Sequence, residues 1–234
     1  MMETLALGDL NDQQKSYTNF SRSFSYSLLD RYENEINIES NSYYSIEFSI
    51  PRDPNLIIPP MCPQNVTLLN HEKSEVFHYH LINLTQNNSN LTFSLHLEVQ
   101  PLNVNLSYVL IYQFDDIPKL NSLHNWTYLC PEDFNEDHVW IHFLDNHQTS
   151  HHYSINYGIR ELDSREKKFC SDKTLHPNLF VKVDQPFHFT ADYRLRIYQS
   201  GCFYLDSNHQ WQSDGLRVSC FFLSFLFSCF VNCR

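Results

Sequence analysis

Apolar and polar side chains alternate along much of the chain from Tyr43 onward. The clearest example is the segment 91–100, LTFSLHLEVQ. Its apolar positions are Leu91, Phe93, Leu95, Leu97 and Val99, and every residue between them is polar. A period of two residues puts the apolar set on one face of a β-strand. The pattern predicts an antiparallel strand with one face against the core and the other in water.

The next segment, 106–114, alternates as well, but both of its faces are apolar. Leu110 and Tyr112 share one face, while Val109 and Ile111 share the other. A strand that is apolar on both faces is typical of the centre of a sheet. Only residues 103–105 separate it from the preceding strand, and so short a connection predicts a hairpin.

Further strands follow from the same period. They are expected at 43–50, 76–84, 139–145, 153–162, 187–198 and 202–206. No segment of about a dozen residues has the 3.6-residue period of an amphipathic helix. The pattern therefore predicts a mainly β protein built as an antiparallel β-sandwich. Residues 1–42 show little period and are interpreted as a linker or a ragged domain edge.

Composition supports strands and excludes several classes of function. The chain has 18 Phe and 14 Tyr but only 4 Gly, and aromatic side chains suit the half-buried surface of a sheet. The net charge of −11 and the lack of a Lys/Arg cluster argue against a nucleic-acid partner. The sequence has no glycine-rich phosphate loop and no Gly-x-Ser-x-Gly elbow of a serine hydrolase. No cofactor is expected.

Cysteines and glycosylation sequons together indicate an oxidising compartment. The 7 cysteines form no Cys-x-x-Cys pair, which leaves disulfides as the favoured use. Chance would give about three Asn-x-Ser/Thr sequons, and the chain has more than that. They begin at Asn19, Asn65, Asn83, Asn87, Asn90, Asn105 and Asn125. A cytoplasmic protein with accidental sequons is the alternative.

The first residues, MMETLALGDLNDQQKS, do not resemble a secretory signal peptide, which suggests a piece of a longer polypeptide.

Several groups of polar residues have some features of a metal site, but none is complete and no metal is predicted. His78 and His80 share one face of a strand, but two imidazoles need a third converging ligand. The acidic residues at 115–116 and 132–137 lack the regular spacing of a calcium loop and favour a solvated surface. The tryptophans, among them Trp126, are expected to be core anchors, with a glycan at Asn125 beside Trp126.

The segment 193–218 has the character of a small hairpin module. Alternating residues run up to Ser200–Gly201, where a tight turn is expected, and a second strand begins at Cys202. Further turns are expected at 206–208 and 213–215. Strands this short are not stable alone and must pack on a larger sheet.

The stretch YRLRIYQSGCFYLDSNHQWQSDGLRV is similar to the start of the proteolysis-site motif that closes the GAIN domain of polycystin-1-like proteins. This family includes the polycystic-kidney-disease-1-like proteins and the receptor for egg jelly. The matching motif residues are Gly201, Cys202, Trp211, Asp214 and Gly215. Upstream blocks in the same order extend the resemblance over residues 43–218. They are SIPRDPNLIIPP, NLTFSLHLEVQPLN, YVLIYQFDDIPKLN, HFLDNHQTSHHYSINYGIRELDS and FCSD.

The resemblance implies an extracellular GAIN-like β-sandwich next to the membrane-spanning region of a larger glycoprotein. Such parents take part in cation-channel complexes, calcium signalling and the sensing of mechanical or chemical cues, with a polycystin-2-like channel subunit as a partner of the parent. The resemblance also implies a Cys130–Cys170 disulfide, and it leaves Cys202 to pair with Cys220, Cys229 or Cys233. The His-Leu-Thr or His-Leu-Ser ending of cleaving members does not occur, so autoproteolysis is not expected.

Residues 219–234 form an apolar tail that departs from the motif. The apolar stretch from Val218 to Val231 is shorter than the roughly 20 residues that span a bilayer as a helix. The tail is interpreted as a splice or gene-model end, with a weak membrane anchor as the alternative.

The sequence and the family resemblance together predict a non-catalytic extracellular module that transmits force or ligand occupancy. The alternatives are an autoproteolytic domain in the full-length product and a truncated secreted glycoprotein acting as a decoy for an extracellular ligand.

Overall fold

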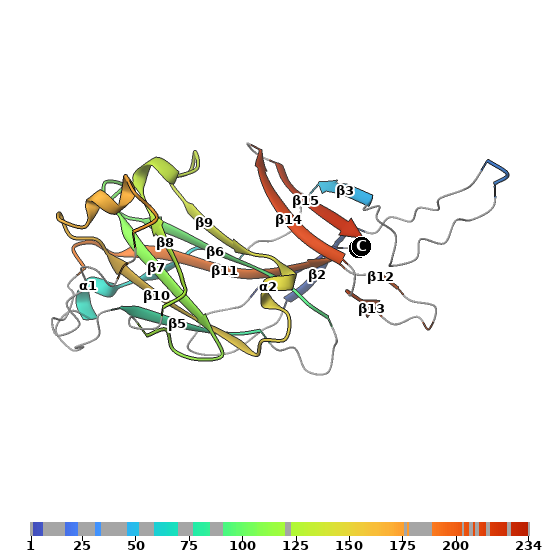
Figure 1. Ribbon diagram of the computed structural model, residues 1–234, viewed down its shortest axis with the longest axis horizontal. Helices are drawn as coiled ribbons and strands as arrows, with labels where there is room; N and C mark the ends of the chain where they lie inside the picture. The colour runs from blue at the N-terminus through green and yellow to red at the C-terminus, as the bar shows by residue number, and fades with distance from the viewer. Residues whose placement is uncertain are drawn as a thin grey trace.

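The computed structural model contains two packed antiparallel sheets (Figure 1). The residues it describes are 2–6, 17–22, 31–33, 46–51, 59–69, 77–84, 91–119, 123–175, 177, 189–202, 204–205, 208, 211–213, 216–223 and 226–233. The mainly β antiparallel sandwich predicted from the alternation is confirmed.

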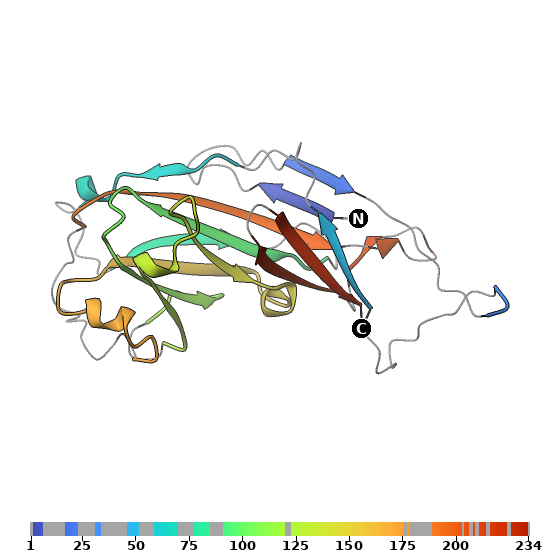
Figure 2. The same ribbon diagram turned by 90° about the horizontal axis from the view of Figure 1, so that it is seen from above.

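The larger sheet has the strand order β2-β1-β11-β6-β9, with β4 pairing with β11 beside β1. Its strands are β1 (Met2–Ala6), β2 (Tyr17–Arg22), β4 (Cys62–Gln64), β6 (Ser94–Pro101), β9 (Trp140–Leu144) and β11 (Tyr193–Cys202). The ten-residue strand β11 lies in the middle of this sheet and runs along its full length (Figure 2). Its ladder with β6 covers 193–200, and its ladder with β1 covers 198–202.

The smaller sheet has the order β5-β10-β7-β8. Its strands are β5 (His78–Asn83), β7 (Tyr108–Phe114), β8 (Asn125–Leu129) and β10 (Ser154–Glu161). The predicted central position of β7 is confirmed, because β7 pairs with β10 on one side and β8 on the other. Short helical turns lie in the connections, at α1 (Val66–Leu69), α2 (Asn146–Thr149) and two 3-10 turns, Pro131–Asp133 and Lys167–Cys170.

The core lies between the two sheets and is built from the alternating apolar positions. Leu95, Leu97 and Val99 of β6 are almost fully buried there, and Leu110 and Ile159 face them from the smaller sheet. Trp140 of β9 packs in the same cluster, which confirms one of the three tryptophans as a core anchor. Burying each of these side chains stabilises the fold by about 1.5–3 kcal/mol before the ordering entropy is counted.

The predicted hairpin between 91–100 and 106–114 is wrong. β6 pairs with β11 and β9, whereas β7 pairs with β10 and β8, so residues 102–106 cross from one sheet to the other. The Leu102 N–H donates to the Asp192 carbonyl at 3.1 Å, which attaches this crossing to the base of β11. The two strands bring their apolar faces together across the core instead of lying side by side.

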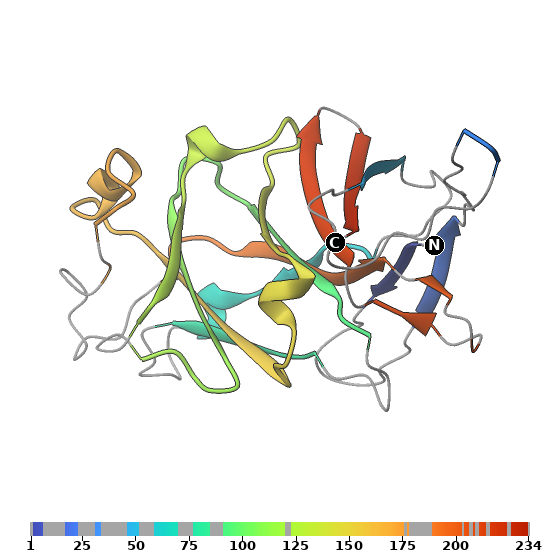
Figure 3. The ribbon, with the colours of Figure 1, turned by 45° about the vertical axis from the view of Figure 1, so that its right-hand side comes forward.

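Several strands lie where the sequence predicted irregular structure. β1 and β2 are in the segment interpreted as a linker, and β8 occupies a stretch where no strand was expected. A hairpin of β14 (Leu216–Leu223) and β15 (Leu226–Cys233) begins before the predicted boundary at 218 and runs through the tail, and β15 also pairs with β3 (Ile46–Pro51) (Figure 3). The domain boundaries at 42 and 218 stay predictions.

The predicted tight turn at Ser200–Gly201 is also wrong. β11 continues through both residues to Cys202, and Gly201 lies opposite Glu3 of β1. A glycine inside a strand is tolerated when the ladder on its edge continues, as it does here. The two-stranded pair β12 (Tyr204–Leu205) and β13 (Trp211–Gln212) follows after β11 ends.

Candidate functional site

A flap formed by residues 163–175 covers the outer face of the smaller sheet. Val109 and Ile111 of β7 point to this face and are fully buried. They pack with Phe169 and Cys130 in a second apolar cluster that is separate from the main core. Both faces of β7 are therefore apolar because one faces the core and the other lies under the flap.

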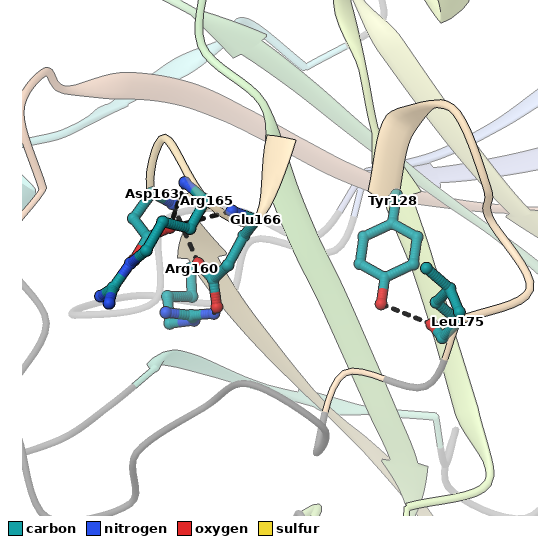
Figure 4. A network of polar contacts seen from close by, with 6 residues as sticks. All are labelled: Tyr128, Arg160, Asp163, Arg165, Glu166 and Leu175. Atoms are coloured by element: carbon teal, nitrogen blue, oxygen red, sulfur yellow. Dashed lines mark hydrogen bonds and ion pairs between the residues drawn. The ribbon is translucent and has the colours of Figure 1, made fainter. Parts of the chain in front are cut away.

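A disulfide between Cys130 and Cys170 attaches the flap to the end of β8. Both cysteines lie at the second cluster, where the Tyr128 ring stacks on Phe169 with centroids 5.1 Å apart. The Tyr128 hydroxyl donates to the Leu175 carbonyl at 2.7 Å (Figure 4). The disulfide that the resemblance implied for these two residues is thus present.

Charged side chains hold the flap at its other end. Arg160 of β10 forms an ion pair with Glu166, and both side chains are buried (Figure 4). The Asp163 carboxylate accepts the backbone N–H groups of Arg165 at 2.7 Å and Glu166 at 2.9 Å. Partial burial raises the pKa of Asp163, but these hydrogen bonds outweigh it and hold the pKa below its ordinary value. The carboxylates are engaged within the flap.

The outer face of the larger sheet carries a row of polar side chains, which we call the polar row. It consists of His96, Glu98, Arg196, Tyr198 and Ser200. The Arg196 guanidinium binds the Glu98 carboxylate, with the Nε–Oε2 distance at 2.9 Å. The Tyr198 hydroxyl donates to the same carboxylate at 2.9 Å, and the His96 ring stacks on the Tyr198 ring. Four of the five side chains are buried, so the predicted wet face of β6 is wrong.

The polar row includes a serine–histidine pair. His96 Nε2 is hydrogen-bonded to Ser200 Oγ at 2.8 Å, a geometry that a nucleophilic serine requires. Ser200 is 2% exposed and His96 is 3% exposed. A substrate could not reach this hydroxyl without displacing the chain that covers it, so the pair is better explained as part of the buried network.

His78 and His80 converge on one tyrosine across the sandwich. His78 Nδ1 lies 2.6 Å from the Tyr193 hydroxyl oxygen, and His80 Nε2 lies 3.0 Å from the same atom. Burial first, and then the neighbouring His78, lower the pKa of His80 to about 3. The shared face predicted for the two histidines is confirmed. Their partner is a phenol on the opposite sheet, and the three side chains join β5 to β11.

The acidic positions do not gather around one point. Asp115 accepts the backbone N–H groups of Tyr153 and Ser154 and contacts His152 Nδ1 at 2.7 Å. Asp133 pairs with Lys173 of the flap. The one close group of metal-ligating residue types in the described part of the chain is Cys130, Glu132 and Cys170, and its two sulfur atoms already form the disulfide.

The described sequons lie at the surface. Asn65, Asn83 and Asn105 are exposed, and Asn125 is partly buried at the start of β8. The side chain of Asn19 and the residues Asn87 and Asn90 lie outside what the structure describes. Asn83 and Asn125 are on β5 and β8, the two edge strands of the smaller sheet.

The residues of the partial proteolysis-site motif are only partly described. Gly201 and Cys202 end β11, and Trp211 begins β13. Asp214 and Gly215 lie outside the described residues, as do the side chains of Cys202, Trp211 and Cys220. The backbone register of the tail hairpin puts Cys220 opposite Cys229. The pairing of Cys202 stays a prediction.

Sequence reasoning did not find the polar row or the Arg160–Glu166 pair. Arg160 stands near the end of β10 with acidic residues after it, but Glu161 and Asp163 are nearer in sequence than its partner Glu166, so the sequence does not single out the pair. In the polar row, Glu98 and its partner Arg196 are 98 residues apart, which no local pattern can reveal.

Comparison with known proteins adds no relative. No protein-family model, curated protein or solved structure matches this chain. Within the described residues, no helix is both long enough and apolar enough to cross a bilayer. The family resemblance therefore stays a prediction.

Proposed function

We propose that this chain is a non-catalytic extracellular module of a polycystin-1-like membrane protein. Its role is to connect a sensing ectodomain to the membrane region of a parent that acts in cation-channel and calcium signalling. The parent's partner in this proposal is a polycystin-2-like channel subunit. The observation that carries the extracellular assignment is the Cys130–Cys170 disulfide that attaches the flap to the smaller sheet.

The disulfide supports this proposal through its chemistry and its position. It closes a loop of 40 residues, and in the chain-entropy model such a cross-link stabilises the fold by about 4 kcal/mol. Structural disulfides form and persist in oxidising compartments and are rare in the cytosol. The bond fixes the flap over Val109 and Ile111, so its reduction would release the cover of an apolar face.

The sequons are consistent with the same compartment. Asn65, Asn83 and Asn105 are exposed, so the folded sandwich can carry a glycan at each without burying it. At Asn65 the third residue of the sequon is Thr67, whose hydroxyl donates to Asp192 at 2.8 Å. The proposal expects these three sites to be occupied in the mature protein.

The position of β11 supports a role in carrying tension. The strand lies between β6 and β1 and is hydrogen-bonded on both edges, with β4 adding a short ladder near its start. A load applied along β11 from its Cys202 end would have to shear these ladders together. The proposed mechanism is that force or ligand occupancy passes along this strand into the segment that resembles the proteolysis-site motif.

Expression of the gene's complete reading frame in cultured animal cells tests the proposal. We expect surface labelling of the protein, a mass decrease on peptide-N-glycosidase F treatment, and a Cys130–Cys170 peptide on non-reducing mass spectrometry. A Cys130→Ser/Cys170→Ser variant is the matched control for the disulfide peptide. A product that stays cytosolic, unglycosylated and reduced would contradict the proposal.

A further inference from the structure

An aromatic cluster lies where the edge strands of the two sheets approach each other. β8 ends one sheet and β9 ends the other. The Trp140 Nε1–H donates to the Cys130 carbonyl at 2.7 Å, which joins β9 to the residue directly after β8. Towards the other end of β8, on the core side, lie Tyr112, His142 and Tyr157, which we call the edge cluster.

The rings of the edge cluster contact one another across the two sheets. The ring centroids of Tyr112 and His142 are 5.0 Å apart, and those of Tyr112 and Tyr157 are 5.6 Å apart. Tyr157 is fully buried, whereas Tyr112 and His142 are partly exposed. The cluster therefore has an inner part in the core and an outer part that solvent can reach.

Two polar atoms of this cluster are buried without a partner. Neither His142 Nε2 nor the Tyr157 hydroxyl has a hydrogen-bond partner among the described residues. Burial also lowers the pKa of His142 to about 4, and its imidazole is neutral near pH 7. A neutral ring offers one N–H donor and one acceptor nitrogen.

The strand register puts a sequon asparagine directly beside this cluster. Asn125 of β8 lies opposite Tyr112 of β7, and directly opposed residues of an antiparallel pair point to the same face. Trp126 lies opposite Ile111 and therefore points to the other face. A glycan at Asn125 does not lie beside Trp126, as the sequence suggested, but starts from the face that carries Tyr112.

We propose that Asn125 is glycosylated and that the first N-acetylglucosamine of its glycan packs against the edge cluster. The apolar face of the sugar ring covers the exposed part of Tyr112. The buried atoms His142 Nε2 and the Tyr157 hydroxyl lie beneath the rings and are not contacted by the sugar. This inference rests on the proposed function, because N-glycosylation requires the secretory pathway.

The other described sequons provide matched controls. Asn83 lies opposite Ser154 of β10, while Asn65 and Asn105 precede α1 and β7. All three are exposed, so their glycans extend into water. The Asn125 glycan is distinguished from them by its contact with the protein.

Site-resolved deglycosylation of the full chain expressed in animal cells tests the contact. Under native conditions, peptide-N-glycosidase F should release the Asn125 glycan about tenfold more slowly than the Asn83 glycan, since release requires the sugar to leave its contact. After denaturation the two rates should be equal. Tyr112→Leu should remove the difference in native rates, and Tyr112→Phe, which keeps the ring, should preserve it.

A stability cycle gives a second readout. Tyr112→Leu should lower the melting temperature more in the glycosylated wild type than in Asn125→Gln, and Asn83→Gln should leave the effect of Tyr112→Leu unchanged. Equal effects in the three backgrounds, or equal native release rates, would overturn the inference. If Asn65, Asn83 and Asn105 carry glycans and Asn125 does not, only the inference is lost. If none of the four is occupied, the proposed function is contradicted as well.

Discussion

The two sheets of the sandwich bury their outer faces in opposite ways. The smaller sheet has an apolar outer face, with Val109 and Ile111 under a flap that a disulfide holds in place. The larger sheet has a polar outer face, where Glu98 is buried with Arg196 and Tyr198 as its partners. An apolar face is stabilised by any cover that excludes water, whereas a polar face is stabilised only if every buried group finds its partner.

The comparison predicts that the apolar face depends most on its covalent cover. Replacing Cys130 and Cys170 together with serine should lower the free energy of unfolding by about 4 kcal/mol, because the unfolded chain regains the entropy that the cross-link removes. Urea denaturation of the oxidised wild type and the double variant measures this difference. The reduced wild type should behave like the variant. A loss below about 1 kcal/mol would mean that packing alone holds the flap.

The polar face should be most sensitive to the loss of one partner. Glu98→Ala leaves the Arg196 guanidinium and the Tyr198 hydroxyl without their acceptor. Removing one member of a buried pair costs about 3–5 kcal/mol, and we expect about 3 kcal/mol because Arg196 is 21% exposed and water can partly solvate it. Denaturant unfolding at pH 7 is the measurement.

A matched double variant separates pairing from packing at this position. Glu98→Leu with Arg196→Met removes both charges and keeps most of the side-chain volume. It should be clearly more stable than Glu98→Ala, since no charge is left without a partner. The single variants Glu98→Leu and Arg196→Met complete the cycle. If the double variant loses as much stability as these two single variants added together, the pair is not energetically coupled.

The contrast also explains how far the sequence could predict this fold. Alternation identified β6, β7, β9 and β10 because each of them buries an apolar face. It placed β7 centrally, since Val109 and Ile111 needed a cover. It could not predict that His96 and Glu98 are buried, because their partners are supplied by β11, about a hundred residues away. It missed β8, although Trp126 and Tyr128 alternate with Thr127 and Leu129.

The candidate site was predicted less completely than the fold. The sequon positions and the pairing of Cys130 with Cys170 came from motifs and from the family resemblance. The contact of Tyr112 with His142 depends on how the two sheets face each other, and the position of Asn125 beside Tyr112 depends on strand register. Neither is encoded in a local period.

A buried histidine between the two sheets, His80, should make the stability of the protein sensitive to acid. Burial and His78 lower the pKa of His80 to about 3 in the folded state, while an unfolded histidine has a pKa of about 6.5. The unfolded chain therefore binds a proton first as pH falls, and the stability that is complete above pH 6.5 is lost progressively towards pH 3. The titratable groups in contact with His80 are His78 and Tyr193. The Tyr193 ring in turn contacts Tyr108, on which Glu161 and Asp192 act.

Between pH 7 and pH 5 this single histidine should lower the free energy of unfolding by about 2 kcal/mol. Urea denaturation at both pH values measures the change. His80→Gln should reduce the difference between the two pH values, whereas His147→Gln, at an exposed position of α2, should leave it as in the wild type. An unchanged pH dependence in His80→Gln would exclude His80 as a source of acid sensitivity.

The smallest predicted effect returns to the apolar outer face and concerns its packing. Gly158 of β10 lies beneath the Tyr79 ring, and a Cβ at this position would be 2.9 Å from Tyr79 Cε1 and 3.0 Å from Ile111 Cγ1. Gly158→Ala should therefore destabilise the protein by about 1–2 kcal/mol through overpacking, even though alanine is the better strand residue. Tyr79→Leu in the same chain should recover part of the loss, because it removes the ring that the new methyl group meets. If Gly158→Ala is neutral with or without Tyr79, the space beneath the Tyr79 ring tolerates added volume and this part of the face is not closely packed.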